Sequence, residues 1–189
     1  MTQHIYITEE SLPWLIEASA EERKRLISRL SPDSRILLLS MIANHYKTFL
    51  IPEELSPLLR ESPRSAKFHN LFMEVTAGIP SDMVYDLCKK QGDPEKQTLY
   101  IAALTQKVNG GDPAAFRYLC DVAMSTERQS ELRYSALTGL RMMPQAKVSG
   151  IRRKAETTMR HILRDGQNST EIRQSARSLL QHWHQGGDR

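Results

Sequence analysis

Two stretches of the sequence share one pattern and begin 40 residues apart: ELRYSALTGL at residues 131–140 and EIRQSARSLL at residues 171–180. Glutamate, arginine, serine, alanine and the final leucine are identical in the two stretches, and Leu132 aligns with Ile172. A match of this kind at a fixed spacing indicates an internal repeat. The repeat organises our interpretation of the whole chain.

Each stretch carries an apolar face with a small residue at its centre. Ile172, Ala176 and Leu179 fall at positions i, i+4 and i+7, and therefore on one side of a helix. Ala136 takes the central place in the first stretch, where it allows a neighbouring helix to approach closely. One helical hairpin cannot cover such a face alone, so the pattern predicts hairpins that stack on one another.

The form [Leu/Ile]-Arg-x-x-Ala-x-x-[Gly/Leu]-Leu at residues 132–140 and 172–180 resembles the second helix of HEAT and armadillo repeats, whose periods are about 40–47 residues. A fainter copy, EKQTLYIAAL at residues 95–104, has Gln97 in place of the arginine. The resemblance covers roughly residues 80–184. It implies an all-α fold in which helical hairpins form an α-solenoid, and an irregular helical bundle is the alternative.

Turn residues divide the rest of the chain into helical segments. Asp-Pro pairs at residues 93–94 and 112–113 are typical of helix starts, and a helix is expected over residues 146–164. We expect an N-terminal helical cap region over residues 1–63 that ends in a proline-rich connector, residues 51–63. The repeats are then expected over residues 64–184, followed by a disordered tail at residues 185–189.

The composition favours a helical globular protein. Of the 189 residues, 40% are hydrophobic, 25% are charged and only 6% are aromatic. The longest apolar run, residues 36–42, is much shorter than the roughly 20 residues that a membrane span needs. The start MTQHIYITEE is unlike a signal peptide, and two cysteines make no disulfide framework. We therefore expect a cytoplasmic protein without a membrane contact.

Motifs that carry known chemistry are missing from the sequence. It has no His-Glu-x-x-His or Cys-x-x-Cys metal motif, no phosphate-binding P-loop and no Gly-x-Ser-x-Gly nucleophile turn. Cys88 and Cys120 occupy similar places in neighbouring expected helices, which favours packing in the core. The sequence accordingly predicts no catalytic residue, no metal site and no cofactor.

Charge is distributed unevenly along the chain. Residues 1–95 hold 11 Lys/Arg and 14 Asp/Glu, whereas residues 96–189 hold 15 Lys/Arg and 8 Asp/Glu. This asymmetry favours an acidic partner for the second half, or the acidic end of another copy in a homo-oligomer. The third interpretation is two solvated surfaces that differ in composition.

A basic surface in the second half is the strongest candidate for binding. On the helix expected over residues 146–164, Arg160 lies opposite Ile151 of the apolar stripe, because nine residues at 100° each separate the two positions by 900°, which is two full turns and a half. Arginine also forks onto carboxylates and phosphates better than lysine. The candidate partner-binding residues are Arg133, Arg152, Arg153, Lys154, Arg160, Arg164, Arg173 and Arg177.

These observations predict a non-enzymatic scaffold, adaptor or regulatory subunit that presents a basic solenoid surface to an acidic protein. The alternative is binding to a nucleic-acid backbone, since some HEAT-like proteins are DNA-repair glycosylases that hold DNA in a basic groove. No motif carries their catalytic residues onto this sequence. A solvated outer face without a partner is the remaining interpretation.

Overall fold

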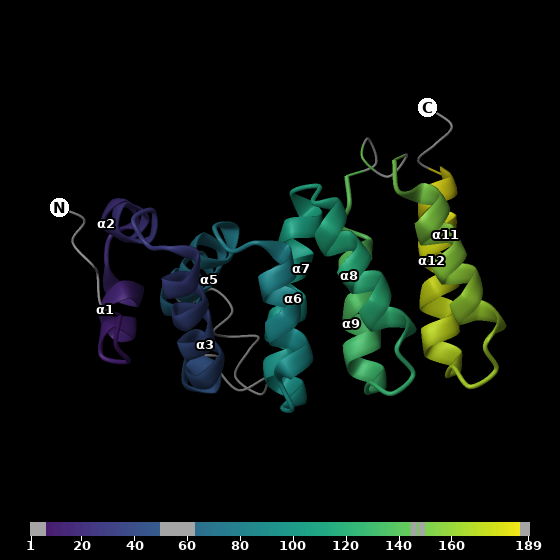
Figure 1. The fold of residues 1–189 in the computed structure, drawn as a ribbon, viewed down its shortest axis with the longest axis horizontal. Coiled ribbons are helices and arrows are strands. Elements are labelled where there is room, and N and C mark those ends of the chain that lie inside the picture. Colours follow the sequence, from purple (N-terminus) through teal and green to yellow (C-terminus); the bar gives the residue numbers. More distant parts are fainter. Residues whose placement is uncertain (1–6, 50–62, 145–146, 148–149, 186–189) are drawn as a thin grey trace. The chain divides into compact units, whose positions relative to one another are not determined.

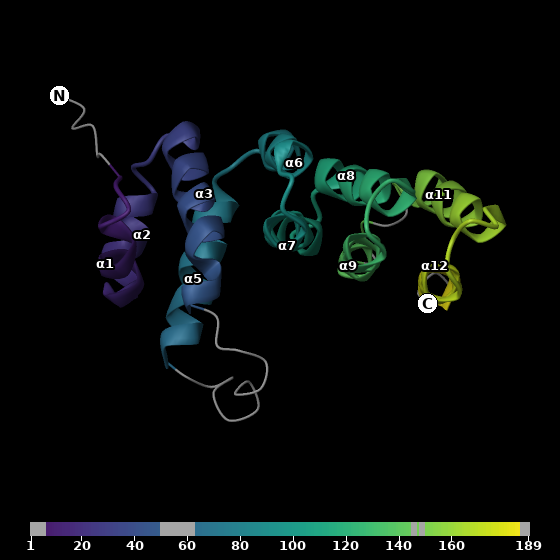
Figure 2. The ribbon, with the colours of Figure 1, turned by 90° about the horizontal axis from the view of Figure 1, so that it is seen from below.

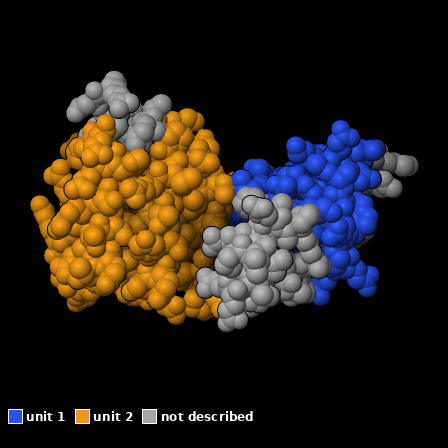
Figure 3. All heavy atoms as spheres, turned by 180° about the vertical axis from the view of Figure 1, so that it is seen from behind, with its two compact units in different colours: residues 1–80 blue, residues 81–189 orange. Residues whose placement is uncertain are grey.

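The computed structural model describes residues 7–49, 63–144, 147 and 150–185 of the chain. Within these ranges the regular elements are ten α-helices without a strand, which confirms the predicted all-α class (Figure 1). The chain divides into two compact units, residues 1–80 and residues 81–189, coloured separately in Figure 3. Each unit is described by itself.

Unit 1 contains four described helices: α1 (Ser11–Glu17), α2 (Ala20–Ile27), α3 (Pro32–Phe49) and α5 (Pro63–Ala77). Helix α5 contacts the other three, and its Leu71 and Val75 are fully buried. The Nε atom of Arg23, a buried residue of α2, lies 2.8 Å from Oε2 of Glu74 on α5. Because α5 packs here, the division falls after Pro80 and not at the expected position after residue 63. Residues 51–62 of the expected connector lie outside the described residues.

The described residues of unit 2 form three consecutive helical hairpins. Its helices are α6 (Ser81–Lys90), α7 (Pro94–Asn109), α8 (Pro113–Met124), α9 (Ser130–Leu140), α11 (Arg152–Arg164) and α12 (Thr170–Gln185). Figure 2 shows them in two rows, with α6, α8 and α11 in one row and α7, α9 and α12 in the other. Each helix contacts its hairpin partner and the next helix in its own row. The helix expected over residues 146–164 corresponds to α11, which begins later, at Arg152. Residues 186–189 of the expected tail lie outside the described residues.

The starts of α7 and α8 follow the predicted chemistry. The Asp93 carboxylate accepts a hydrogen bond from the Glu95 backbone N–H at 3.0 Å, with Pro94 as the first helical residue. The Asp112 carboxylate accepts from the Ala114 N–H at 2.8 Å and precedes Pro113. Gly111, with φ of 82°, supplies the left-handed conformation between α7 and α8. These caps set the short joints that place successive helices antiparallel.

The small residues predicted at the centre of the apolar faces are buried. Ala136 of α9 and Ala176 of α12 have no exposed surface. Gly139 marks a still closer approach, because a Cβ atom on it would lie 2.3 Å from Oγ1 of Thr105 on α7 and 2.8 Å from Cδ1 of Leu119 on α8. A larger side chain at Gly139 would therefore push α9 away from two helices at once.

Neighbouring hairpins are also joined by polar and aromatic contacts. The Ser81 hydroxyl at the start of α6 donates to the Asp112 carboxylate at 2.6 Å, and the rings of Tyr85 and Tyr118 stack with centroids 4.4 Å apart. Partial burial would raise the pKa of Asp112, but the hydrogen bonds from Ser81 and from the α8 backbone outweigh it and lower this pKa below the ordinary value. The cap of α8 is therefore also a link to the hairpin before it.

Candidate functional site

The predicted division of α11 into two faces is present in the structure. Ala155, Met159 and Ile162 are buried on one side together with the hydroxyl-bearing Thr158. The cations of the other side are exposed: Arg153, Lys154, Arg160 and Arg164. Arg152 begins the helix, and its side chain lies outside the described residues. The exposed cations do not form one surface, because Arg153 and Lys154 line a groove against α8, whereas Arg160 and Arg164 lie outside its lining.

The first hollow is a groove between α8 and α11, with a volume of about 910 Å³. We call it the α8–α11 groove; its lining residues are Phe116, Arg117, Met124, Gly150, Ile151, Arg153, Lys154, Thr157, Thr158 and His161. Arg117 comes from α8, whereas Arg153, Lys154 and His161 come from α11. No carboxylate is among these lining residues, so the groove gathers positive charge from two hairpins.

The floor of the α8–α11 groove is apolar and tied to the core. Phe116 is 1% exposed, and its ring centroid lies 5.7 Å from that of Trp183 on α12. Trp183, which is eleven residues after Ile172 and on the same side of α12, is itself buried. Cys120 of α8 also lies in this core, where burial raises the pKa of its thiol to about 12. A thiol with this pKa stays protonated near neutral pH, which suits core packing and not nucleophilic chemistry.

Arg133 does not belong to a binding surface, and its prediction as a partner-binding residue needs correction. The side chain is 5% exposed. Its Nε donates to the Ala123 carbonyl at the end of α8 at 2.9 Å, and its Nη2 donates to Oδ1 of Asn168 in the joint between α11 and α12. Asn168 in turn donates to the Ile162 carbonyl at 2.8 Å. Arg133 is thus a link between hairpins, and its donors face the interior because oxygen acceptors lie there.

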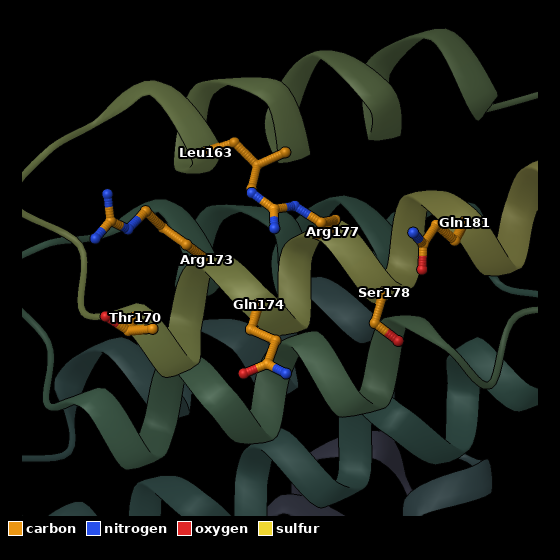
Figure 4. Close-up of a pocket in the computed structure, with 7 residues that line it drawn as sticks. All are labelled: Leu163, Thr170, Arg173, Gln174, Arg177, Ser178 and Gln181. Carbon is orange, nitrogen blue, oxygen red and sulfur yellow. The ribbon is translucent and has the colours of Figure 1, made fainter.

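The second hollow lies on the last hairpin and has a volume of about 570 Å³. We call it the α12 hollow; its lining residues are Leu163, Thr170, Arg173, Gln174, Arg177, Ser178 and Gln181. Figure 4 shows the side chains of Arg173 and Arg177 extending from α12 toward the α11 side. Arg160 is outside this lining, and its Nη2 lies 3.7 Å from a carboxylate oxygen of Glu156 one turn earlier.

Sequence reasoning missed Arg117 and His161 as groove residues. Arg117 belongs to another hairpin than the basic stripe of α11, and its closeness to Lys154 results from packing between α8 and α11. His161 shares the groove side of α11 with Lys154, seven residues earlier, so helical spacing could have identified it once the groove side was known. For Arg117 the sequence offered no comparable signal.

The described residues contain no cluster of histidine, cysteine and carboxylate side chains that could hold a metal ion. Among the same residues, none of the helices combines the length and the apolar character needed to cross a membrane. Comparisons of the chain with known protein families, with curated proteins and with solved structures found no match. The two hollows and their charge are therefore the features on which a function can be argued.

Proposed function

We propose that the protein is a non-enzymatic adaptor that holds an acidic segment of a partner protein in the α8–α11 groove. The observation that carries this proposal is the convergence of Arg117 with Arg153 and Lys154 around an apolar floor, without a carboxylate in the lining. Apolar floor and charged rim are the combination found at protein interfaces, where the floor supplies affinity and the charges supply orientation.

We further propose that unit 2 is a HEAT-like solenoid. Its support is the recurrence of one contact at the same place in successive hairpins. Arg133 donates to a carbonyl at the end of α8, and Gln97, which the sequence aligns with it, donates through Nε2 to the Cys88 carbonyl of α6 at 3.4 Å. A contact that recurs with the repeat is typical of stacked hairpins with equivalent interfaces.

An acidic protein suits the α8–α11 groove better than a nucleic-acid backbone. Binding to a backbone is carried by phosphate contacts along an extended track, and unspecific single-strand binding adds exposed aromatic rings on which bases stack. The ring in this groove, Phe116, is buried against Trp183 and presents no free face. Met124 and Ile151 offer apolar surface in the groove, against which aliphatic side chains of an acidic segment can pack while its carboxylates contact the cations.

The experiment is affinity capture with the full chain from nuclease-treated extract of the native cell, followed by binding measurements with the captured protein in purified form. The test variant combines Arg117→Glu with Lys154→Glu, both exposed groove residues. The matched control combines Lys24→Glu with Arg25→Glu on the exposed side of α2, which changes the net charge equally. We expect the groove variant to bind at least about tenfold more weakly and the control to bind as the unmodified protein does.

Two results would overturn the proposal. Loss of all captured material after nuclease treatment, together with steeply salt-dependent binding to oligonucleotides, would assign the groove to nucleic acid. Equal binding by the groove variant and the control would show that the contact lies elsewhere. Circular dichroism of both variants checks that the helices remain folded.

A further inference from the structure

The last hairpin carries cations where the hairpin before it carries core residues. At the spacing of 40 residues, Cys120 of α8 corresponds to Arg160 of α11, and Leu137 of α9 corresponds to Arg177 of α12. Cys120 and Leu137 are buried, whereas Arg160 and Arg177 are exposed. A helix face that no described hairpin covers needs polar side chains, but polarity alone requires neither sign of charge. Here the substituted positions are cationic.

Arg133 and Arg173 are 40 residues apart and hold the same position in the repeat, but the guanidinium of Arg173 has no acceptor among the described residues. Its counterpart Arg133 satisfies two donors on the Ala123 carbonyl and on Asn168 of the following hairpin. No described residue gives the Arg173 guanidinium a hydrogen bond or an ion pair, and the half-buried side chain lines the α12 hollow instead. At this one repeat position, the guanidinium donors of Arg133 therefore meet oxygen acceptors, whereas those of Arg173 meet none among the described residues.

The α12 hollow combines two guanidinium groups with further donors and no negative charge. Arg173 and Arg177 are four residues apart and thus neighbours on one side of α12. Thr170 and Gln181 add a hydroxyl group and an amide to the lining, and Gln174 and Ser178 line it from the flank of α12 opposite the two arginines (Figure 4). The side chain of Arg177, like that of Arg173, has no hydrogen-bonded or ionic partner among the described residues.

We propose that the α12 hollow binds a phosphorylated serine or threonine in a segment of a partner protein. A carboxylate satisfies one guanidinium fork, whereas a phosphate monoester has three terminal oxygens and a charge near −2, which matches two forks. A nucleic-acid phosphate carries one charge per diester and needs a continuous track, but the lining cations of this hollow are only two. The α8–α11 groove has no part in this site.

The test follows the arginine Nε–Hε signals of the ¹⁵N-labelled full chain by NMR during titration with a Gly-Gly-phosphoSer-Gly-Gly peptide. We expect saturable shifts of the Arg173 and Arg177 signals, and binding roughly tenfold weaker for the matching peptide with glutamate in place of phosphoserine. The matching serine peptide should cause no saturable shift. The double variant Arg173→Gln and Arg177→Gln should lose the response.

The matched control, Arg153→Gln with Lys154→Gln, removes the same charge from the α8–α11 groove and should retain phosphopeptide binding. This control also separates the two proposals, because groove variants leave the α12 hollow intact. The proposal is overturned if the glutamate peptide binds as tightly, if the groove arginines respond equally, or if single-stranded oligothymidylate binds more tightly than the phosphopeptide. Binding of inorganic phosphate without binding of the phosphopeptide would define a free-anion site and would overturn it as well.

Discussion

The α8–α9 hairpin and the α11–α12 hairpin have nearly the same internal core but opposite outer faces. Leu132 and Ile172 are both buried, as are Ala136 and Ala176. Phe116 of the first hairpin, however, is buried against Trp183 of the second, and its counterpart Glu156 is half-buried beside Arg160. The comparison teaches that the interior of a hairpin repeats with the sequence, whereas its outer face depends on whether another hairpin follows.

The largest effect should come from giving α9 the outer face of α12. Leu137→Arg places a guanidinium at a position that is 2% exposed, and we expect a loss of about 3–5 kcal/mol in the free energy of unfolding. Urea denaturation in a Trp14→Phe background measures it, because Trp183 then remains as the sole tryptophan and reports on unit 2.

The reverse change, Arg177→Leu, provides the control for this comparison. Arg177 is exposed, so the substitution should alter the free energy of unfolding by less than about 0.5 kcal/mol. Equal losses in the two variants would mean that α12 does not cover Leu137 in solution.

The next effect concerns the arginine that links hairpins. Arg133→Met keeps most of the side-chain volume but leaves the Ala123 carbonyl and Oδ1 of Asn168 without their donor. We expect a loss of about 2–4 kcal/mol, measured by the same denaturation. Arg173→Met, at the corresponding place in α12, should stay within about 0.5 kcal/mol, and a comparable loss there would remove the difference between the two arginines.

A smaller effect is expected at the closest approach of α9 to its neighbours. Gly139→Ala adds a Cβ atom 2.3 Å from Oγ1 of Thr105, whose hydroxyl already donates to the Ile101 carbonyl at 2.9 Å. The helices must move apart, at a cost of about 1–3 kcal/mol by thermal or urea unfolding. The double variant with Thr105→Ala should recover part of this loss, and a stabilising effect of Gly139→Ala alone would contradict the packing.

The last effect depends on pH and is absent near neutral pH. Burial raises the pKa of Cys120 to about 12, whereas a thiol in the unfolded chain ionises near about 8.5. Between these values the unfolded chain has lost a proton that the folded chain keeps, so stability falls as pH rises, by up to about 1.4 kcal/mol per pH unit. Cys120→Ala removes this contribution. Urea midpoints between about pH 8 and 10.5 should therefore fall less steeply for the variant, and parallel curves would show that α11 does not bury this thiol.

Several features of the fold could be predicted because they depend on residues close in sequence. The Asp93 and Asp112 caps, the buried stripe of α11 and the burial of Trp183 follow from helical spacing and capping chemistry within one segment. The boundary between the two units does not follow from such local spacing. The pattern of α5 shows that it has an apolar side but not which helices cover that side, and the contacts with α3 and α1 place α5 in unit 1.

The binding surfaces were predicted in part. Helical spacing placed Arg153, Lys154 and Arg160 on the exposed side of α11. Arg133 was grouped with them only as a cation of the basic second half, although Asn168, which is 35 residues further along the chain, accepts its hydrogen bond in the interior. Arg117 joined the groove only through the packing of α8 against α11.

The sequence by itself determined that this protein is helical, where α7 and α8 begin, and which side of α9 and α12 is apolar, because these properties arise from interactions within a few turns. Only the tertiary structure decided which cations meet and which one is enclosed. Guanidinium groups at equivalent positions have the same local chemistry, and their different surroundings come from a neighbouring hairpin that is present for Arg133 and is not among the described residues for Arg173.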